Sequence, residues 1–150
     1  MIAPEYKNMS DLSLLELCVW REARGEPVDG QRGVAHVVRN RVYSGTRWWG
    51  DDWRSVILHP WQFSSFNPSD PNSKRWPSND DYAALSGIVE PVFSGTDADL
   101  TNGATFYYDT SIKWPVAWGP ERNYDNTLNI GRLKFFKLKQ AAELNLQGDA

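Results

Sequence analysis

Hydrophobic residues recur at helical spacing in three segments of the first hundred residues, and this feature constrains the fold most. Glycine or proline follows each segment closely, as expected where helices end. The first helix is predicted to begin at a Ser10 or Ser13 cap and to end near residue 23, before Gly25 and Pro27. This part of the chain is therefore expected to fold as helices that bury one face.

The same signals predict two further helices and one short turn. The second helix is expected over residues 29–43, with Asp29 as its cap. A short helical turn is expected over residues 52–58. The third helix is expected over residues 80–93, where acidic residues crowd the first turn and Pro91 either kinks the helix or ends it.

The pattern changes in the last part of the chain. Residues 104–108 and 134–138 are aromatic-rich and bounded by turn residues, so short strands are predicted there. A long loop is expected over residues 109–129, and a closing helix over residues 139–146. Helices followed by short strands predict an α+β fold that is mainly α. The length suits one domain, which we place at residues 1–150.

Composition and charge exclude several classes of function. A net charge of −3 lacks the excess of Lys and Arg that a general nucleic-acid binder needs. No run of about 20 apolar residues is present, so no membrane span is expected. Charged residues interrupt the first segment, so we expect no signal peptide and synthesis in the cytoplasm. Eight Trp are present, and we expect some to line a carbohydrate groove and others to fill the core.

Metal-dependent and nucleophilic chemistry have little support. His36 and His59 are the only histidines, and neither stands in an H-E-x-x-H or Cys/His pattern. Cys18 lies on an apolar helix face, where a buried inert thiol is expected. No G-x-S-x-G elbow is present. We therefore predict neither a metal nor a cofactor, and we expect His36 to be a core or surface residue.

Glu22 has an unusual place on the first helix. It lies three residues after Val19 and seven after Leu15, so it falls on the apolar face near the helix end. A carboxyl there is partly desolvated and faces the negative end of the helix dipole, and both effects favour the protonated form. A protonated carboxyl is the general acid that glycoside cleavage needs. The alternative is a structural residue that turns outward or pairs with Arg21 or Arg24.

Most glycosidases also need a second carboxylate about 5 to 9.5 Å from the first. The sequence dictates no such partner. Glu26 is expected in a supporting role, because Gly25 and Pro27 disfavour helical geometry beside it. A lytic transglycosylase avoids the requirement, since a hydroxyl of the substrate attacks and one acid/base serves both steps. The remaining candidates, each also suited to a cap or a turn, are Asp29, Asp51, Asp52 and Asp109.

Four stretches of the sequence carry a resemblance to a known family. The run EARGEPVDGQRGVAHVVRNRV at residues 22–42 resembles the signature of the cell-wall hydrolase family that includes the catalytic domains of spore cortex-lytic enzymes. The stretches VILHPWQFS (56–64), NGATFYYD (102–109) and NIGRLKFFK (129–137) are similar to its later blocks. The resemblance covers nearly the whole chain.

The resemblance implies a lysozyme-like, mainly helical fold with a small β region. It also implies a lytic transglycosylase that cuts peptidoglycan glycan strands between N-acetylmuramic acid and N-acetylglucosamine. Glu22, the first acid of the first run, would be its catalytic residue. The residues expected at the substrate are Glu26, Gln62, Phe63, Tyr107 and Trp114.

The last stretch departs from the family pattern. Gly131, Arg132 and Leu133 stand where the family often shows Gly-Asn-His, so contacts with the substrate are expected to differ at that end.

Two alternatives stay open, a hydrolysing muramidase with an Asp as second carboxylate and an inactive peptidoglycan-binding protein. The leading expectation is a monomeric phage-type endolysin that reaches the cell wall after holin-type release.

Overall fold

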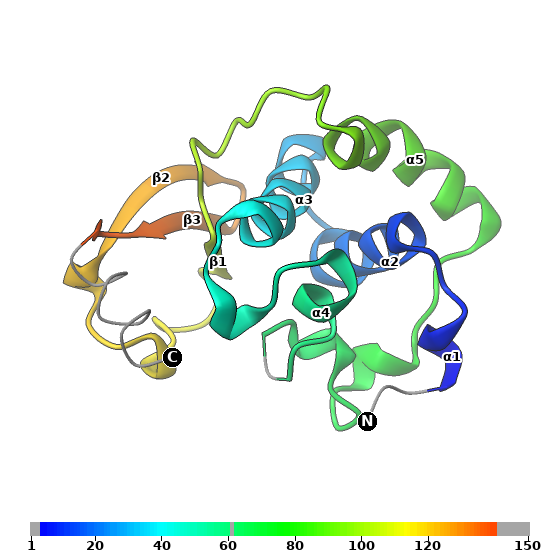
Figure 1. Ribbon diagram of the computed structural model, residues 1–150, viewed down its shortest axis with the longest axis horizontal. Coiled ribbons are helices and arrows are strands. Elements are labelled where there is room, and N and C mark those ends of the chain that lie inside the picture. Colours follow the sequence, from blue (N-terminus) through cyan, green and yellow to red (C-terminus); the bar gives the residue numbers. More distant parts are fainter. Residues whose placement is uncertain (1–3, 61, 141–150) are drawn as a thin grey trace.

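The computed structural model describes residues 4–60 and 62–140. Figure 1 shows the helices on one side of the molecule and a small sheet on the other, with α3 between the sheet and the remaining helices. The mainly α fold class with a small sheet is confirmed. The helices are α1 (Pro4–Lys7), α2 (Asp11–Ala23), α3 (Val28–Tyr43), α4 (Trp53–Ile57) and α5 (Asn79–Ser94), and the strands are β1 (Phe106–Asp109), β2 (Tyr124–Ile130) and β3 (Leu133–Leu138).

Side-chain caps set the start of α2 but not that of α3. Ser10 caps α2 by accepting a hydrogen bond from the backbone N–H of Ser13, so the first of the two predicted caps is confirmed. α3 begins at Val28 with Pro27 before it, and the prediction that Asp29 caps this helix was wrong. Asp29 lies in the first turn and pairs with Arg32 at 2.8 Å, where its charge also suits the helix dipole.

The shorter α4 and the long α5 end where the sequence indicated. Asp52 caps α4 and Ser78 caps α5, each in a reciprocal capping box with the residue three positions on. Pro91 lies in the last turns of α5, and the helix continues past it to Ser94. Gly95 then closes α5 in the left-handed conformation, with φ of 84°, which glycine adopts without strain.

The sheet contains one strand that the sequence did not reveal. Its order is β1-β3-β2 with both pairs antiparallel, and β2 carries an irregular register between Asn126 and Leu128. The prediction of a loop throughout residues 109–129 was therefore wrong, because residues 124–130 form an edge strand. Of the closing helix expected over 139–146, residues 141–146 lie outside the described residues.

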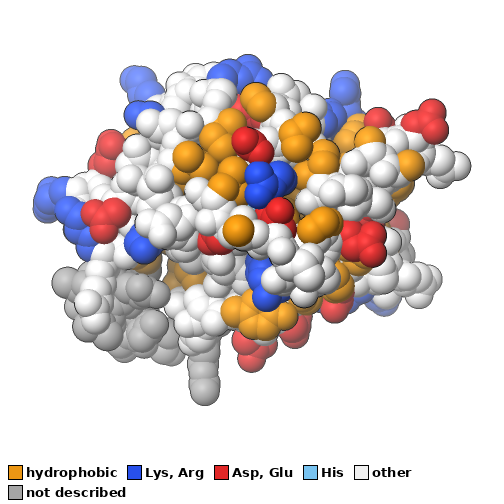
Figure 2. All heavy atoms as spheres, turned by 90° about the horizontal axis from the view of Figure 1, so that it is seen from above, with side chains coloured by type: hydrophobic (Ala, Val, Ile, Leu, Met, Phe, Trp, Pro, Cys, Tyr) orange, Lys and Arg blue, Asp and Glu red, His pale blue; other side chains and the backbone are white. Residues whose placement is uncertain are grey.

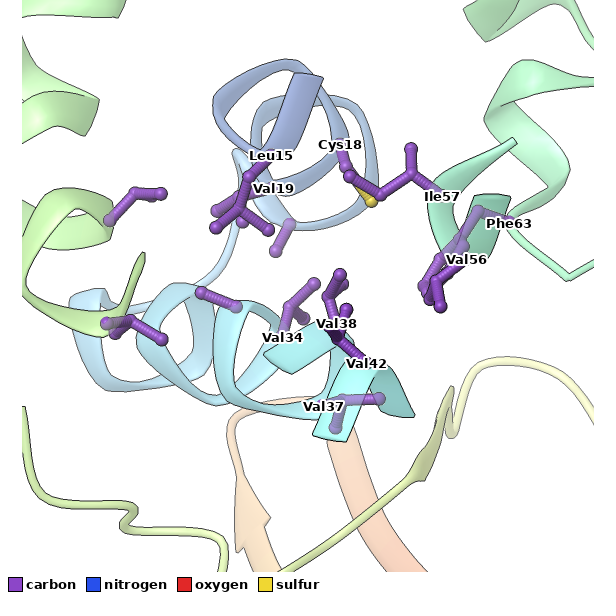
Figure 3. Packing of buried hydrophobic residues seen from close by; sticks show 14 of the residues in the cluster. Leu15, Cys18, Val19, Val34, Val37, Val38, Val42, Val56, Ile57 and Phe63 are labelled. Carbon is purple, nitrogen blue, oxygen red and sulfur yellow. The ribbon is translucent and has the colours of Figure 1, made fainter. Parts of the chain in front are cut away.

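The main core lies between α2, α3, α4 and α5. Figure 3 shows Leu15 and Val19 pointing from α2 toward Val34 and Val38 of α3, and none of the four has exposed surface. Burying such a side chain contributes about 1.5 to 3 kcal/mol, so this contact between α2 and α3 is a large part of the driving force for folding.

A glycine lets α3 approach the sheet closely. A Cβ atom at Gly33 would lie 2.6 Å from the ring of Phe135 on β3, closer than side-chain atoms approach each other. Because Gly33 has no side chain, the buried Phe135 ring can pack directly on the backbone of α3. This contact fixes the distance between the helices and the strands that carry the site.

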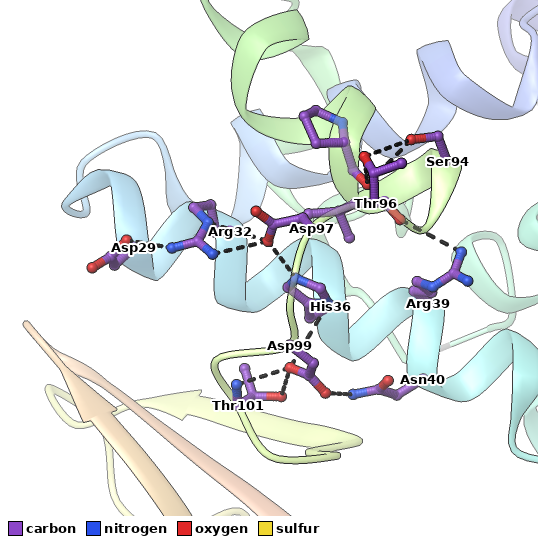
Figure 4. A network of polar contacts seen from close by, with 12 residues as sticks. Asp29, Arg32, His36, Arg39, Asn40, Ser94, Thr96, Asp97, Asp99 and Thr101 are labelled. Atoms are coloured by element: carbon purple, nitrogen blue, oxygen red, sulfur yellow. Dashed lines mark hydrogen bonds and ion pairs between the residues drawn. The ribbon is translucent and has the colours of Figure 1, made fainter.

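A polar network fastens the segment after α5 to α3 (Figure 4). His36 is 2% exposed, and its Nε2 lies 2.7 Å from Asp97, which also accepts from Arg32. Asp99 accepts from the amide of Asn40 at 2.9 Å. The sequence analysis expected His36 to be either a core or a surface residue, and the structure shows that it is a buried residue paired with Asp97.

The sequence analysis predicted neither general nucleic-acid binding nor a membrane span. Figure 2 views the molecule from above Figure 1 and shows acidic and basic side chains mixed on that face, with no extended basic patch. Among the helices in the described part of the chain, none has the length and apolar character needed to cross a membrane.

Candidate active site

A cleft of about 450 Å³ lies between the helical side and the sheet. Its walls come from the end of α2, from α3, from the segments before and after α4, from β1 and the loop that follows it, and from the start of β3. The residues that line it are Glu22, Arg41, Trp48, Gln62, Phe63, Ser64, Phe106, Tyr107, Tyr108, Asp109, Ile112, Pro115, Ala117, Trp118 and Leu133.

Glu22 lies in this cleft, half-buried in the last turn of α2. Its Oε1 accepts a hydrogen bond of 2.6 Å from the hydroxyl of Tyr107. Neither neighbouring arginine forms an ion pair with it within the described residues, because Arg21 donates to groups elsewhere and Arg24 stacks on Trp20. The outward-facing, ion-paired alternative is therefore not what the structure contains.

Tyr107 is held so that its hydroxyl faces Glu22. It belongs to β1, and its ring lies between those of Phe63 and Phe135, with centroid distances of 6.5 and 5.9 Å. Burial, together with the negative charge of Glu22, raises the pKa of Tyr107 well above its usual value. The hydroxyl therefore keeps its proton at neutral pH and acts as a hydrogen-bond donor to the carboxylate.

Arg41 is a cleft residue that the sequence analysis did not single out. It is 4% exposed, and it donates to the backbone oxygen of Thr105 at 2.7 Å and to Oε1 of Gln62 at 3.2 Å. Burial lowers the pKa of Arg41 to about 10, so it stays charged at neutral pH. Its guanidinium lies within 5.2 Å of the ring centroids of Trp49, Phe63 and Phe106.

A signal for Arg41 was present in the sequence. Arg41 lies seven residues after Val34 and three after Val38, so it shares the buried face of α3, as Glu22 shares that of α2. A charged residue on an apolar stripe needs buried partners, and it is a candidate for a site.

The structure brings most of the predicted substrate residues together. Gln62, Phe63 and Tyr107 line the cleft with Glu22. Trp114 does not; its Nε1 donates to the backbone oxygen of Gly119, and its ring packs against those of Tyr108, Trp118 and Phe136. Two other tryptophans do line the cleft, namely Trp48 and Trp118.

Glu26 also lies outside the cleft lining. Its carboxylate, 8% exposed, accepts from the backbone N–H of Arg132 at 3.1 Å and lies 4.0 Å from the guanidinium of that residue. It therefore holds the turn between β2 and β3 against the start of α3. Its predicted contact with the substrate stays a prediction.

Only one of the four candidate second carboxylates lines the cleft. Asp109 follows Tyr107 by two positions on β1, so both side chains leave the strand on the same face. The pKa of Asp109 is below its usual value, because hydrogen bonds from Ser111 and the charge of Arg132 outweigh the effect of burial. Asp109 is therefore ionised at neutral pH.

The residues described here do not gather as a metal site would require. Within residues 4–60 and 62–140, no three His, Cys, Asp or Glu side chains meet in a group that could hold an ion. Cys18 is a buried residue of α2, and burial raises the pKa of its thiol well above the usual value, which disfavours the nucleophilic thiolate.

Solved structures share this fold. The catalytic domain of the Bacillus cereus SleB protein matches with a TM-score of 0.65 and 27% identity, over 87% of this chain and 94% of that one. The catalytic domain of the germination-specific lytic transglycosylase SleB from Bacillus anthracis matches with a TM-score of 0.65 and 26% identity, over 87% and 98%. The lysozyme-like fold that the resemblance implied is confirmed.

Sequence comparisons agree with the structural ones. The spore cortex-lytic enzyme of Halalkalibacterium halodurans is 32% identical over 100 residues, which is 67% of this chain and 27% of that protein. The chain thus spans about a quarter of that relative's length. A family model described as cell wall hydrolase matches residues 25–136, beginning three residues after Glu22. The chain belongs to the cell wall hydrolase family.

Proposed function

We propose that this protein cleaves peptidoglycan glycan strands between N-acetylmuramic acid and N-acetylglucosamine, as a lytic transglycosylase with Glu22 as its single acid/base. The family, the spore cortex-lytic relative and the likeness to a lytic transglycosylase domain support the substrate. The observation that carries the chemistry is a half-buried glutamate in a cleft, held by a tyrosine.

The contact with Tyr107 divides the work of the two carboxylate oxygens of Glu22. Oε1 accepts from the tyrosine hydroxyl, so the carboxyl group has a fixed orientation. Oε2 is then the oxygen that exchanges a proton with the substrate. Oε1 can accept this hydrogen bond whether Oε2 carries a proton or not, so the carboxyl group keeps its place through two proton transfers.

The reaction needs no second carboxylate. Glu22 donates its proton to the glycosidic oxygen, the bond from that oxygen to C1 of the muramic sugar breaks, and the N-acetylglucosamine side leaves with a hydroxyl. The oxygen of the muramic C6 hydroxyl then bonds to C1, and the carboxylate of Glu22 accepts the proton that this hydroxyl loses. The product is a 1,6-anhydromuramic end, and Glu22 is protonated again.

The aromatic walls suit a sugar polymer. Trp48, Tyr108 and Trp118 all line the cleft. Flat aromatic rings pack against the apolar faces of sugar rings, while the polar edges of the sugars reach hydrogen-bonding groups. Among the described tryptophans, Trp49 and Trp53 are buried in the core, whereas Trp48 and Trp118 line the cleft.

Asp109 favours a second candidate, a hydrolysing muramidase. An ionised carboxylate in the cleft could activate water on the face of the sugar opposite the acid. That reaction would leave reducing muramic ends in place of anhydro ends. It requires two carboxylates, so removal of either should abolish it.

Clearance of purified sacculi by matched variants tests the proposal. Glu22→Gln should lower the rate at least ~10²-fold without changing the thermal midpoint, as expected on loss of a general acid/base. Glu90→Gln, an exposed residue of α5, is the matched control and should clear at the wild-type rate. Asp109→Asn should cost less than ~10-fold in a transglycosylase and at least ~10²-fold in a hydrolase. Clearance by Glu22→Gln at the wild-type rate would remove Glu22 from the mechanism.

We also propose that the protein acts as an endolysin, as a monomer made in the cytoplasm and released to the cell wall through a membrane lesion. Expression in a bacterial host with and without a separate membrane-permeabilising protein tests this role. Lysis only when the membrane is opened supports it. Lysis without any lesion contradicts it.

A further inference from the structure

The contact between Arg41 and Gln62 fixes which way the amide of Gln62 points. Arg41 Nη1 lies 3.2 Å from Oε1 of Gln62, and a guanidinium has only donors. The partner atom must therefore be the amide oxygen. The amide nitrogen, with its two N–H donors, is the branch turned away from Arg41.

Arg41 is a rigid support for this orientation. Its side chain is 4% exposed, it also donates to the backbone oxygen of Thr105 at 2.7 Å, and aromatic rings enclose it. A group held by such a surrounding cannot follow Gln62 if that side chain rotates. The orientation of the Gln62 amide is therefore set by the fold, before any ligand arrives.

Gln62 lies near the reacting carboxyl. It precedes Phe63, whose ring faces Tyr107, and the hydroxyl of Tyr107 donates to Glu22. Gln62 and Glu22 line the same cleft. Apolar groups line it too, among them Ile112 and Ala117. The cleft thus combines apolar surface with a side chain whose amide is oriented by Arg41.

We propose that Gln62 selects N-acetylated sugars by donating an amide hydrogen to the carbonyl oxygen of an acetamido group, whose methyl lies on the apolar wall. This inference rests on the proposed function and names the substrate group that the same cleft recognises. An acetamido group offers an acceptor and a methyl, and both match the lining. A sugar with a free ammonium offers neither, and it would place a charged donor against the donor of Gln62.

Sacculi that differ only in acetylation test the proposal. One sample is enzymatically de-N-acetylated, and half of it is re-acetylated with acetic anhydride as the matched substrate. The measurement is the ratio of initial rates of glycan release, re-acetylated over de-N-acetylated, for wild type and variants. Wild type should show a ratio of at least ~10, the size expected for one well-placed hydrogen bond against an unpaired or repelled group.

Gln62→Glu should reverse this preference. The new carboxylate accepts from Arg41 at least as well as the amide oxygen, but it has no donor for an acetamido carbonyl and it attracts an ammonium. The ratio should fall at least ~10-fold relative to wild type. Gln62→Met keeps the approximate shape without donor or charge, so its ratio should fall through slower release from the acetylated sacculi. Gln140→Glu, an exposed residue beyond β3, makes the same chemical change away from the cleft and should keep the wild-type ratio.

Each outcome decides the proposal. Thermal unfolding identifies any variant that does not fold, and the other Gln62 variant then carries the test. A folded Gln62→Glu or Gln62→Met with the wild-type ratio overturns the role of Gln62, and so does a wild type that does not discriminate. A wild type that releases no glycan from either sample contradicts the proposed function itself.

Discussion

Two regions of this protein are built around a buried arginine, and the two arginines have different partners. Arg21 of α2 is 3% exposed and Arg41 of α3 is 4% exposed, and within the described residues neither pairs with a carboxylate. Both lie against aromatic rings. The acceptors of Arg21 are the backbone oxygens of Ser65, Ser73 and Arg75 and the hydroxyl of Tyr6, and those of Arg41 are the backbone oxygen of Thr105 and the side chain of Gln62.

Arg21 and Arg41 differ in the parts of the molecule that supply their hydrogen-bond acceptors. Three acceptors of Arg21 are backbone oxygens of one irregular segment, so Arg21 replaces the hydrogen bonds that a helix or strand would have supplied there. Arg41 donates to the backbone oxygen of Thr105, the residue before β1, and to the side chain of Gln62, which lines the cleft with Glu22. The same buried cation therefore serves the fold in one region and the site in the other.

Arg21→Met should give the largest change in stability. It leaves three backbone oxygens without a donor, two of them buried, so we expect the free energy of unfolding to fall by about 3 to 5 kcal/mol. Urea unfolding measures this, and clearance per folded molecule at low temperature should stay near the wild-type rate. A folded, stable variant that has lost activity would place Arg21 in the site and break the comparison.

Arg41→Met should cost less stability than Arg21→Met and should slow glycan release more. Two acceptors lose their donor, against four for Arg21, so we expect a smaller loss of about 1 to 3 kcal/mol in unfolding free energy. The initial rate of glycan release per folded molecule should fall at least ~10-fold, because Gln62 loses its support. Wild-type release per folded molecule would show that Arg41, like Arg21, serves only the fold.

Tyr107→Phe should affect the rate with little effect on stability. It removes the hydrogen bond to Glu22 and keeps the ring between Phe63 and Phe135. We expect about a 10-fold slower release and a free energy of unfolding within about 1 kcal/mol of wild type. A loss of stability without a loss of rate would show that this hydroxyl matters to packing and not to the acid.

Acid should weaken the polar network that joins α3 to the segment after α5. Hydrogen bonds from His36 and Arg32 outweigh burial and hold the pKa of Asp97 below its usual value, and those from Thr101 and Asn40 do the same for Asp99. These carboxylates therefore stabilise the fold above the unfolded pKa of about 3.9, and the contribution is lost as the pH falls through their lower folded pKa.

The variant Asp97→Asn measures this contribution. It should lower the unfolding free energy by about 1 kcal/mol at pH 7 and make the fall in stability between pH 4.5 and about 2.5 shallower than in wild type. Urea unfolding at several pH values provides the comparison. An equally steep fall in the variant would show that other carboxylates cause the acid loss.

Local signals were enough to predict most of the helices. The Ser10 cap, the Asp52 cap and the glycine after α5 are chemical features of a few neighbouring residues. Residues 124–130 were missed because Asp and Asn disfavour strands, and β2 exists through its pairing with β3. That stabilisation comes from another part of the chain.

In the site too, features set by neighbouring residues could be predicted, and those that depend on distant parts of the chain could not. Periodicity alone brought Glu22 to a buried helix face, and the same rule applied to α3 would have found Arg41. That Trp118, and not the predicted Trp114, lines the cleft depends on how the loop after β1 turns, with Trp114 Nε1 bonded to Gly119. Spacing carries no information on such a turn.

The central claim is that Glu22 alone gives and reclaims the proton in the cleft, and the ends of the released glycans test it most directly. Mass spectrometry of fragments from purified sacculi should find 1,6-anhydromuramic ends with wild type and with Asp109→Asn, and almost none with Glu22→Gln. Reducing muramic ends from wild type, or anhydro ends released by Glu22→Gln at the wild-type rate, would contradict it.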